Sequence, residues 1–124
     1  MNILFLDDNP NRHAAFRNRF PVATHVHTVD DCWRAILTEA YDAVFLDHDL
    51  GGEAYVDSSR ADCGMEIVRR VCNIRTSLGV SLWVVHSHNE VAAKEMEDLL
   101  RLNQSSAGVL RKCFKEICPG YQGI

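Results

Sequence analysis

Acidic and imidazole side chains follow three separate apolar runs in this chain of 124 residues. An apolar run of strand length that ends in turn residues is typical of a buried β-strand. Parallel strands present the residues after their carboxyl ends at one edge of the sheet, where ligands bind. The residues placed there are Asp7 and Asp8 after residues 2–6, Asp47, His48 and Asp49 after residues 43–46, and His86, Ser87, His88 and Asn89 after residues 82–85.

Three carboxylates at one edge indicate a cation site. Asp7, Asp8 and Asp47 would repel one another, so their pKa values would rise in the absence of a cation. Oxygen ligands suit Mg²⁺, while an added imidazole favours Mn²⁺, Zn²⁺ or another transition metal. We expect a divalent metal ion here, with Mg²⁺ or Mn²⁺ favoured over Zn²⁺. Such an ion polarises a phosphoryl oxygen and activates a coordinated water, and His86 or His88 could act as general acid or base.

Candidate phosphate ligands lie close to these acids in the sequence. Arg12 falls one helical turn beyond Asp8, from where its planar guanidinium could grip a phosphate. Ser87, Asn89 and the free N–H groups of the helix that follows form a second anion-binding position. These groups suit the cleavage of a phosphoester and the binding of one equally well.

Each part of this pattern also has a simpler interpretation. Asp7 and Asp8 could be a helix cap and its solvated neighbour, and residues 47–52 could form only a turn. Residues 86–89 could only start a helix, and Arg12 could be a surface arginine in a weak ion pair. Independent turns would rarely all end in acids or imidazoles on one edge, so the combination favours a site. We assign no function to the remaining histidines, which are His13, His25 and His27.

Alternating strand and helix patterns predict an α/β domain. The predicted strands are residues 2–6, 24–28, 43–47, 81–86 and 108–110, with an extension of the last toward Phe114 left open. The predicted helices run from Pro10 to about Phe20 with Asp8 or Asn9 as cap, from a cap at Asp30, from about Asp62, and from a cap at Asn89. Their expected inner residues are Ala15, Phe16 and Phe20; Trp33, Ile36 and Leu37; Met65, Ile67, Val68 and Val71; and Val91, Met96, Leu99 and Leu100.

A flavodoxin-like strand order, 2-1-3-4-5, would place the acids across one crevice. Right-handed crossovers would put helices on both faces of this five-stranded parallel sheet, giving three layers. We predict one domain over residues 1–124, with a long active-site loop at about 48–62. Another strand order would scatter Asp7, Asp47 and His86, so the predictions of topology and of site depend on each other.

The composition excludes several classes of protein. Formal net charge is -4 and no Lys/Arg cluster exists, which argues against a broad duplex nucleic-acid face. No apolar run approaches the roughly 20 residues that span a bilayer, and Met1 leads straight into a strand pattern without room for a signal peptide. The five cysteines lack paired zinc spacing and indicate reduced thiols in a cytoplasmic protein, with Cys32 and Cys72 as core residues.

Over nearly its whole length the chain resembles the receiver domain of two-component response regulators. The residues that carry this resemblance are Asp7-Asp8, Asp47, Gly64-Met65-Glu66, Ser87 and Lys112. The resemblance implies that the acidic pair and Asp47 hold Mg²⁺ and that Asp47 accepts a phosphoryl group. It also implies that Ser87 and Lys112 contact that group.

Where the chain departs from the receiver pattern, it is similar to a narrower group, the cyclic-phosphate processing receiver-like family. The segment between Asp47 and Gly64 is longer than in a receiver, and Lys112 is followed by Cys113 rather than by proline. Members of the narrower family are compact stand-alone domains of bacteria and phages, proposed to act on cyclic phosphates in RNA repair or nucleotide signalling. The motifs that resemble it are Asp7-Asp8 with Arg12, Leu46-Asp47-His48-Asp49-Leu50-Gly51, and His86-Ser87-His88-Asn89.

The leading hypothesis is therefore a metal-dependent phosphoesterase that processes a cyclic phosphate on a small ligand or an RNA end. It assigns the metal to Asp7, Asp8 and Asp47, catalysis to Asp47, His48, Asp49, His86 and His88, and substrate binding to Arg12, Gly51, Ser87, Asn89 and Lys112, with the 48–62 loop closing over the ligand. Two alternatives use the same site: a receiver that accepts phosphate on Asp47, and a sponge that binds a nucleotide without cutting it. The sequence leaves the formation of oligomers open.

Overall fold

The computed structural model describes residues 1–74 and 76–123 and contains a five-stranded parallel sheet in the order β2-β1-β3-β4-β5. The α/β fold class and the strand order are thus confirmed. The strands are β1 (Ile3–Leu6), β2 (Thr24–Val26), β3 (Ala43–Leu46), β4 (Leu82–Val85) and β5 (Gly108–Arg111). The helices are α1 (Pro10–Arg19), α2 (Val29–Thr38), α3 (Gly64–Asn73), α4 (Glu90–Asn103) and α5 (Phe114–Ile117). Among the described residues, no helix has both the length and the apolar character needed to cross a membrane.

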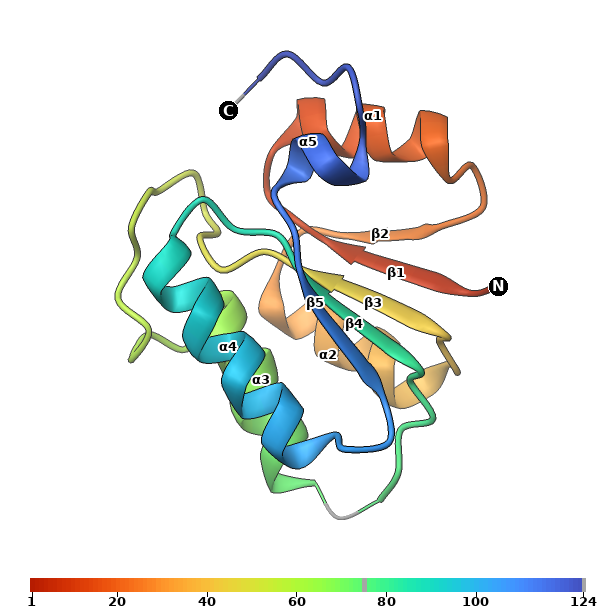
Figure 1. Cartoon of the computed structure of the whole chain (residues 1–124), viewed down its shortest axis with the longest axis vertical. Coiled ribbons are helices and arrows are strands. Elements are labelled where there is room, and N and C mark those ends of the chain that lie inside the picture. Colours follow the sequence, from red (N-terminus) through yellow and green to blue (C-terminus); the bar gives the residue numbers. More distant parts are fainter. Residues whose placement is uncertain (75, 124) are drawn as a thin grey trace.

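The helices lie in two layers, one on each face of the sheet (Figure 1). Helices α2, α3 and α4 cover one face and α1 and α5 the other. Strand side chains alternate between the faces, so the central strands β1, β3 and β4 each contribute to two separate apolar clusters. Leu4, Val44 and Val85 belong to the larger cluster, whereas Phe5 and Phe45 pack on the α1 side.

The predicted cap of α2 was wrong, and the structure defines two boundaries that the sequence predicted only approximately or left open. Helix α2 is capped by Thr28, whose side-chain oxygen accepts from the N–H of Asp31 at 3.2 Å, and Asp30 lies inside the first turn. Helix α3 begins at Gly64, since Asp62 instead forms an ion pair with Arg60. Strand β5 ends before Phe114, which starts the unpredicted helix α5 and is buried on the α1 side.

The predicted caps of α1 and α4 hold. Asn9 caps α1, accepting from the N–H groups of Asn11 and Arg12, and Asn89 caps α4 by accepting from Ala92. The predicted inner stripe of α4 was wrong in part: Met96 and Leu100 are buried with Ala92 and Ala93, but Val91 and Leu99 are exposed. Leu37 of α2 is exposed as well. A buried alanine carries too little apolar signal to mark the true inner face by itself.

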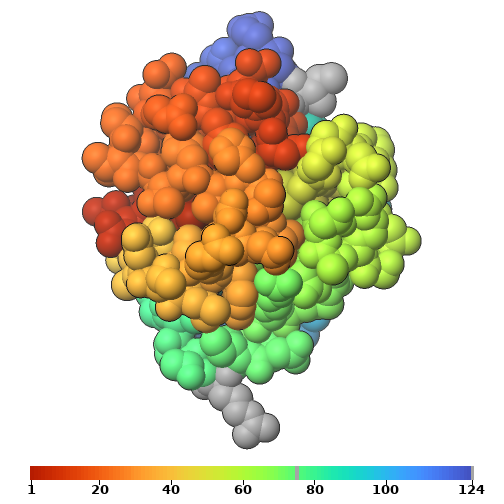
Figure 2. All heavy atoms as spheres, turned by 180° about the vertical axis from the view of Figure 1, so that it is seen from behind, coloured from red at the N-terminus to blue at the C-terminus, as the bar shows by residue number. Residues whose placement is uncertain are grey.

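Residues 47–63 form an irregular loop between β3 and α3. The loop closes on itself, because the N–H of Gly64 donates to the carbonyl of His48 at 2.8 Å. Figure 2 shows its yellow and yellow-green surface bordering the red N-terminal part of the chain. The contact between them includes a hydrogen bond from the N–H of Gly52 to the Asp8 carboxylate.

Candidate metal and phosphate site

Four candidate residues lie in one row across the carboxyl edge of the sheet. Asp7, Asp47, His86 and Lys112 each come one residue after the last paired position of a strand. Their N–H groups extend the strand ladders, donating to the carbonyls of Val26, Leu6, Leu46 and Val85 at 2.9–3.3 Å. The structure thus places residues from four strands side by side, as the predicted strand order requires.

The face of the sheet that these side chains take follows from strand alternation. Phe5, Phe45 and Val84 pack on the α1 side, and the residues two positions later point the same way. The ring of His86 stacks on Phe5 with centroids 5.1 Å apart. Asp7, Asp47 and His86 therefore belong to the α1 side of the edge.

Three carboxylates converge there. Asp7, Asp8 and Asp47 offer ligand oxygens that all lie within 4.8 Å of one another. Asp7 and Asp47 are buried, and each has one oxygen fixed by a backbone N–H: Asn9 donates to Asp7 at 2.8 Å and His48 donates to Asp47 at 2.9 Å. The cluster is rigid because its members are held by the backbone that follows each strand.

Arg12 brings a cation to the other oxygens of the same two acids. Its Nη1 atom lies 3.4 Å from Asp7 Oδ2 and 3.7 Å from Asp47 Oδ2. The side chain is buried, and its guanidinium carbon lies 5.9 Å from the centre of the Phe114 ring. Arg12 is therefore part of the acidic site rather than a surface residue.

The electrostatics of this cluster favour a further cation. Burial raises the pKa of Asp7, although the Asn9 N–H and Arg12 act in the opposite direction. Burial and the neighbouring charge of Asp7 raise the pKa of Asp47 well above its ordinary value. One guanidinium does not balance three carboxylates, and oxygen donors at this spacing suit a hard divalent cation such as Mg²⁺ or Mn²⁺. The residues present thus fit the metal expected from the sequence.

The His86 side chain is buried next to Asp7. It is 1% exposed, and its Nδ1 atom lies 3.7 Å from Asp7 Oδ2. Neither ring nitrogen has a hydrogen-bond partner among the described residues. Burial and the charge of Arg12 lower the pKa of His86 to about 3, so the imidazole is neutral near pH 7. The structure places His86 against the site but not on an accessible surface of it.

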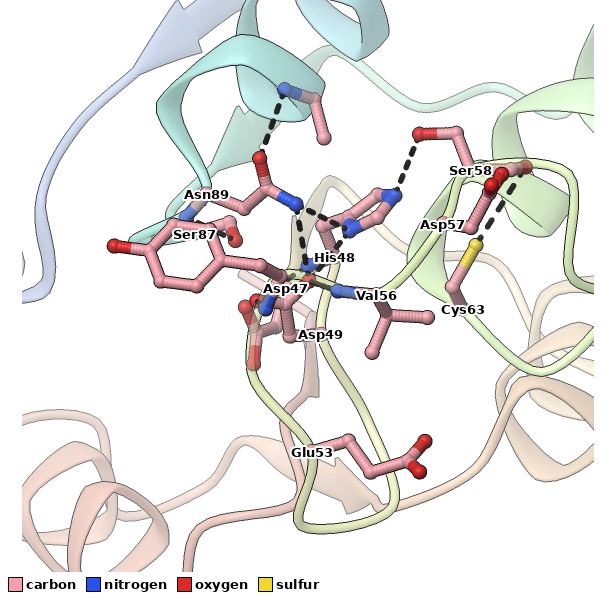
Figure 3. Close-up of polar contacts among 12 residues, drawn as sticks. Asp47, His48, Asp49, Glu53, Val56, Asp57, Ser58, Cys63, Ser87 and Asn89 are labelled. Atoms are coloured by element: carbon pink, nitrogen blue, oxygen red, sulfur yellow. Dashed lines mark hydrogen bonds and ion pairs between the residues drawn. The ribbon is translucent and has the colours of Figure 1, made fainter.

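His48 and Asp49 hold the loop. The imidazole of His48 is fully buried, with Nδ1 2.7 Å from Asp49 Oδ1 and Nε2 2.9 Å from Ser58 Oγ. Asp49 also accepts from the N–H groups of Tyr55 and Val56 at 2.6 and 3.1 Å, and from the Asn89 side chain at 3.3 Å. Figure 3 shows the His48 ring turned toward Ser58 and Asn89.

This Asp–His–Ser arrangement has the connectivity of a hydrolase triad, but Ser58 does not line the cavity that Asp47 and Asp49 line. Burial alone would raise the pKa of Asp49, yet the hydrogen bonds it accepts hold that pKa below its ordinary value. Asp49 is therefore a carboxylate that fastens the loop.

A cavity of about 440 Å³ opens beside the acid cluster. Its wall includes Arg12, Asp47, Asp49, Ser87 and His88. His88 is exposed and is the one imidazole on this wall among the described residues. The cavity therefore joins a strand-three acid, an arginine and a histidine that are far apart in sequence.

Three other candidates lie outside this cavity. Asn89 uses its amide to cap α4 and to bond Asp49, and Gly51 lines a different hollow together with Asp8. Lys112 is exposed and lies 3.7 Å from Glu116, with which it lines a groove on the α5 side. Arg12 thus lies with the acids, whereas the Lys112 ammonium lies in the groove on the α5 side.

The cavity also includes residues that the sequence analysis did not single out. Glu53, Ala54 and Tyr55 of the loop form part of its wall, as does Asn9. The one signal in the sequence that could have pointed to Tyr55 is an aromatic residue within a polar, glycine-containing loop.

Comparison with solved structures places the fold among receiver domains. A response regulator receiver domain (CheY-like) from Methylobacillus flagellatus is 16% identical with a TM-score of 0.55, covering 90% of this chain and 85% of that one. A response regulator from Burkholderia pseudomallei, solved with a phosphorylated aspartic acid, calcium ion and citrate, is also 16% identical, with a TM-score of 0.58 and coverage of 98% and 66%. At this identity the likeness concerns the fold alone.

Sequence comparison gives the narrower assignment. No curated protein matched the chain. A family model described as the cyclic-phosphate processing receiver domain matches residues 2–102, which include β1 to β4, the acid cluster, Arg12 and the 47–63 loop. The match covers most of the 124 residues and agrees with the motifs and the fold described above. The chain belongs to the cyclic-phosphate processing receiver domain family.

Proposed function

We propose that this protein is a metal-dependent phosphoesterase that opens a cyclic phosphate on a nucleotide or an RNA end. The observation that carries the proposal is the meeting of Asp7, Asp8 and Asp47 with Arg12, two of which, Asp47 and Arg12, line one cavity. An oxygen-rich cation site beside a guanidinium suits a phosphoryl group. Family membership supports a cyclic phosphate as the substrate class.

The three carboxylates would hold a divalent ion, which when bound would polarise a phosphoryl oxygen and lower the pKa of a coordinated water. Asp7 and Asp47 are preorganised for this role, because a backbone N–H already fixes Oδ1 of each. The planar fork of Arg12 would bind the phosphate and stabilise the charge that develops on it. Asp7, Asp47 and Arg12 are buried before the substrate arrives, so these groups need little reorganisation.

The proton carrier in this proposal is His88. It is exposed on the cavity wall, and an imidazole can donate or accept a proton near neutral pH. His86 is enclosed and neutral, and the ring of His48 is engaged with Asp49 and Ser58. These two histidines would position the acids and the loop rather than exchange protons with substrate.

A second candidate function, phosphoryl acceptance by Asp47, is favoured by the position of this residue. Asp47 lies on the cavity wall within an acidic cluster, and the Burkholderia response regulator of the same fold was solved with a phosphorylated aspartic acid. Against this candidate, the Lys112 ammonium lies 3.7 Å from Glu116 and does not line the cavity that Asp47 lines.

The test is incubation with Mn²⁺ or Mg²⁺ and a panel of 2′,3′-cyclic mononucleotides and cyclic di- and trinucleotides, with products identified by mass spectrometry. We expect turnover that Asp47→Asn reduces at least a hundredfold and that His88→Gln reduces by about 10²-fold or more. Glu95→Gln, exposed on α4 and outside this cavity, is the control and should retain activity.

The remaining outcomes separate the alternatives. Intact ligand recovered after tight binding would contradict catalysis and favour a nucleotide sponge. Labelling by acetyl phosphate that disappears in Asp47→Asn, without turnover of any cyclic phosphate, would favour the receiver function instead.

A further inference from the structure

The cavity beside the acid cluster is larger than a phosphate requires. At about 30 Å³ for each water in the liquid, 440 Å³ holds roughly fifteen water-sized groups, several times the size of a phosphate. The volume falls within the ordinary range of small-molecule sites. The buried residues Arg12 and Asp47 form part of its wall, and the loop residues Ala54 and Tyr55 form another part. The shape calls for a ligand with a substantial group attached to its phosphate.

Tyr55 is displayed at this cavity in an unusual backbone conformation. It is 75% exposed, and its φ of 53° makes it the one non-glycine residue with positive φ among the described residues. Bulky side chains rarely adopt this left-handed conformation. An exposed ring contributes little to the core, so folding stability does not explain why a tyrosine occupies the position.

The backbone under this ring is held firmly. The N–H of Tyr55 donates to Asp49 Oδ2 at 2.6 Å, and the N–H of Val56 donates to Asp49 Oδ1 at 3.1 Å. Val56 is 7% exposed and belongs to the larger apolar cluster. Asp49 is itself fixed by His48 and Asn89. Tyr55 is thus an exposed aromatic on an ordered support, which lowers the entropy cost of using it as a contact surface.

We propose that Tyr55 is a stacking platform for a nucleobase, so that the ligand of this cavity is a nucleotide rather than a bare phosphate. The proposal rests on the proposed function in one respect, namely that the phosphate lies at Arg12 and the acid cluster. Stacking on an aromatic ring is tolerant of base identity because every base has a π-face. Glu53 and His88 lie on the same cavity wall and offer polar groups to the edge of the base.

The first test is calorimetry in the presence of Mn²⁺, with adenosine 3′-monophosphate, guanosine 3′-monophosphate and inorganic phosphate as probes. We expect Tyr55→Asn to weaken the binding of both nucleotides roughly five- to a hundredfold, the range measured for loss of one aromatic stacking partner. The affinity for inorganic phosphate should not change. Tyr55→Phe is the matched control and should bind like the wild type, because the ring and not the hydroxyl makes the contact.

Asparagine is chosen because it tolerates the left-handed conformation, so the variant keeps the loop backbone. Its thermal unfolding temperature should equal or exceed that of the wild type, which separates loss of the ring from loss of the fold. The proposal is overturned if Tyr55→Asn binds nucleotides as tightly as the wild type, or if it loses inorganic phosphate to the same extent. The proposal is also overturned if the wild type binds neither of the two nucleotides.

These outcomes are independent of turnover. Nucleotide binding through Tyr55 with no cleavage of any cyclic phosphate would contradict the phosphoesterase function and support the stacking role of Tyr55. Cleavage of 2′,3′-cyclic nucleotides with a KM that Tyr55→Asn does not raise would contradict the stacking role of Tyr55 and support the phosphoesterase function.

Discussion

At the scale of single residues, Asp47 shows how closely the site is built into the backbone. Its carboxylate faces Arg12 and Asp7, while its carbonyl packs against the first residue of α3. A Cβ added at Gly64 would lie 1.8 Å from the Asp47 carbonyl oxygen and 3.0 Å from His48 Cα. Gly64 is therefore required by close approach of α3 to the strand end, not by its own backbone conformation.

This contact predicts a large effect for Gly64→Ala. The clash is with backbone atoms, so either α3 or the Asp47 peptide must shift, at a cost of about 3 kcal/mol in the free energy of unfolding. Gly108→Ala is the control, because a Cβ there would lie 3.3 Å from the end of the Leu82 side chain and 3.7 Å from the Ser81 carbonyl oxygen, an ordinary contact. Urea unfolding measures both. Equal and small losses in the two variants would contradict the proposed packing of α3 on Asp47.

At the scale of elements, the 47–63 loop is ordered by side chains from its own start and from helix α3. His48 and Asp49 at its start bind Ser58, Tyr55 and Val56 further along it. Arg69 of α3 adds hydrogen bonds to the carbonyls of Ser58 and Arg60. A segment of this length without regular secondary structure keeps one conformation only when such bonds satisfy its backbone.

The fastening role of His48 is testable by limited proteolysis. His48→Phe fills the same space but leaves Asp49 and Ser58 without their partner, which should cost roughly 1–3 kcal/mol. Trypsin cleavage after Arg60, the one lysine or arginine in the loop, should accelerate severalfold. Ser59→Ala serves as the control. Unchanged cleavage together with lost turnover would instead assign His48 to the chemistry.

A second contact between elements joins α1 to β2 through imidazoles. His13 Nδ1 lies 2.6 Å from His25 Nδ1, and the rings of His13 and His27 lie 4.0 Å apart between centroids. Burial, followed by the charge of Arg17 and the two other histidines, lowers the pKa of His25 to about 4. These histidines, given no role from the sequence, link the helix that carries Arg12 to the sheet.

The lowered pKa of His25 predicts a pH dependence of stability. An unfolded histidine takes up a proton near pH 6.5, whereas folded His25 does so only near pH 4, so stability falls as pH drops from 6.5 to 4. His25→Asn should lose less stability over that interval, by about 1 kcal/mol after solvent screening. Urea unfolding at pH 7 and pH 4 compares the two proteins. If the free energy of unfolding fell equally in the two proteins between pH 7 and pH 4, a lowered pKa of His25 would be contradicted.

At the scale of the whole molecule, the acid cluster links metal binding to folding. Asp7, Asp8 and Asp47 come together only when β1 and β3 pair, so a cation that bridges them binds the folded chain alone. The overall charge of -4 adds to the tendency to retain a cation.

This linkage predicts that Mn²⁺ raises the melting temperature. At a hundred times the dissociation constant the stabilisation is about 2.7 kcal/mol, or roughly 10 °C for a domain of this size. Asp47→Asn should show little shift, and EDTA should reverse the shift in the wild type. Scanning calorimetry or fluorescence with and without metal makes the measurement. An equal rise in the variant would place the metal outside the acid cluster.

The amino-acid sequence by itself determined the strands, their order and the edge at which Asp7, Asp47 and His86 meet. The positions of the strands follow from short-range signals, namely apolar runs, the turn residues after them, and the helix caps at Asn9 and Asn89. The strand order, and with it the shared edge, came from the flavodoxin-like arrangement that an alternating strand and helix pattern fits. Tertiary structure decided which of the residues at that edge face the cavity. His86 turns beneath the acids, Lys112 pairs with Glu116, and Tyr55 reaches the cavity wall. Side-chain direction at a strand end depends on what packs against it, and the packing partners α1, α5 and the loop come from distant parts of the chain.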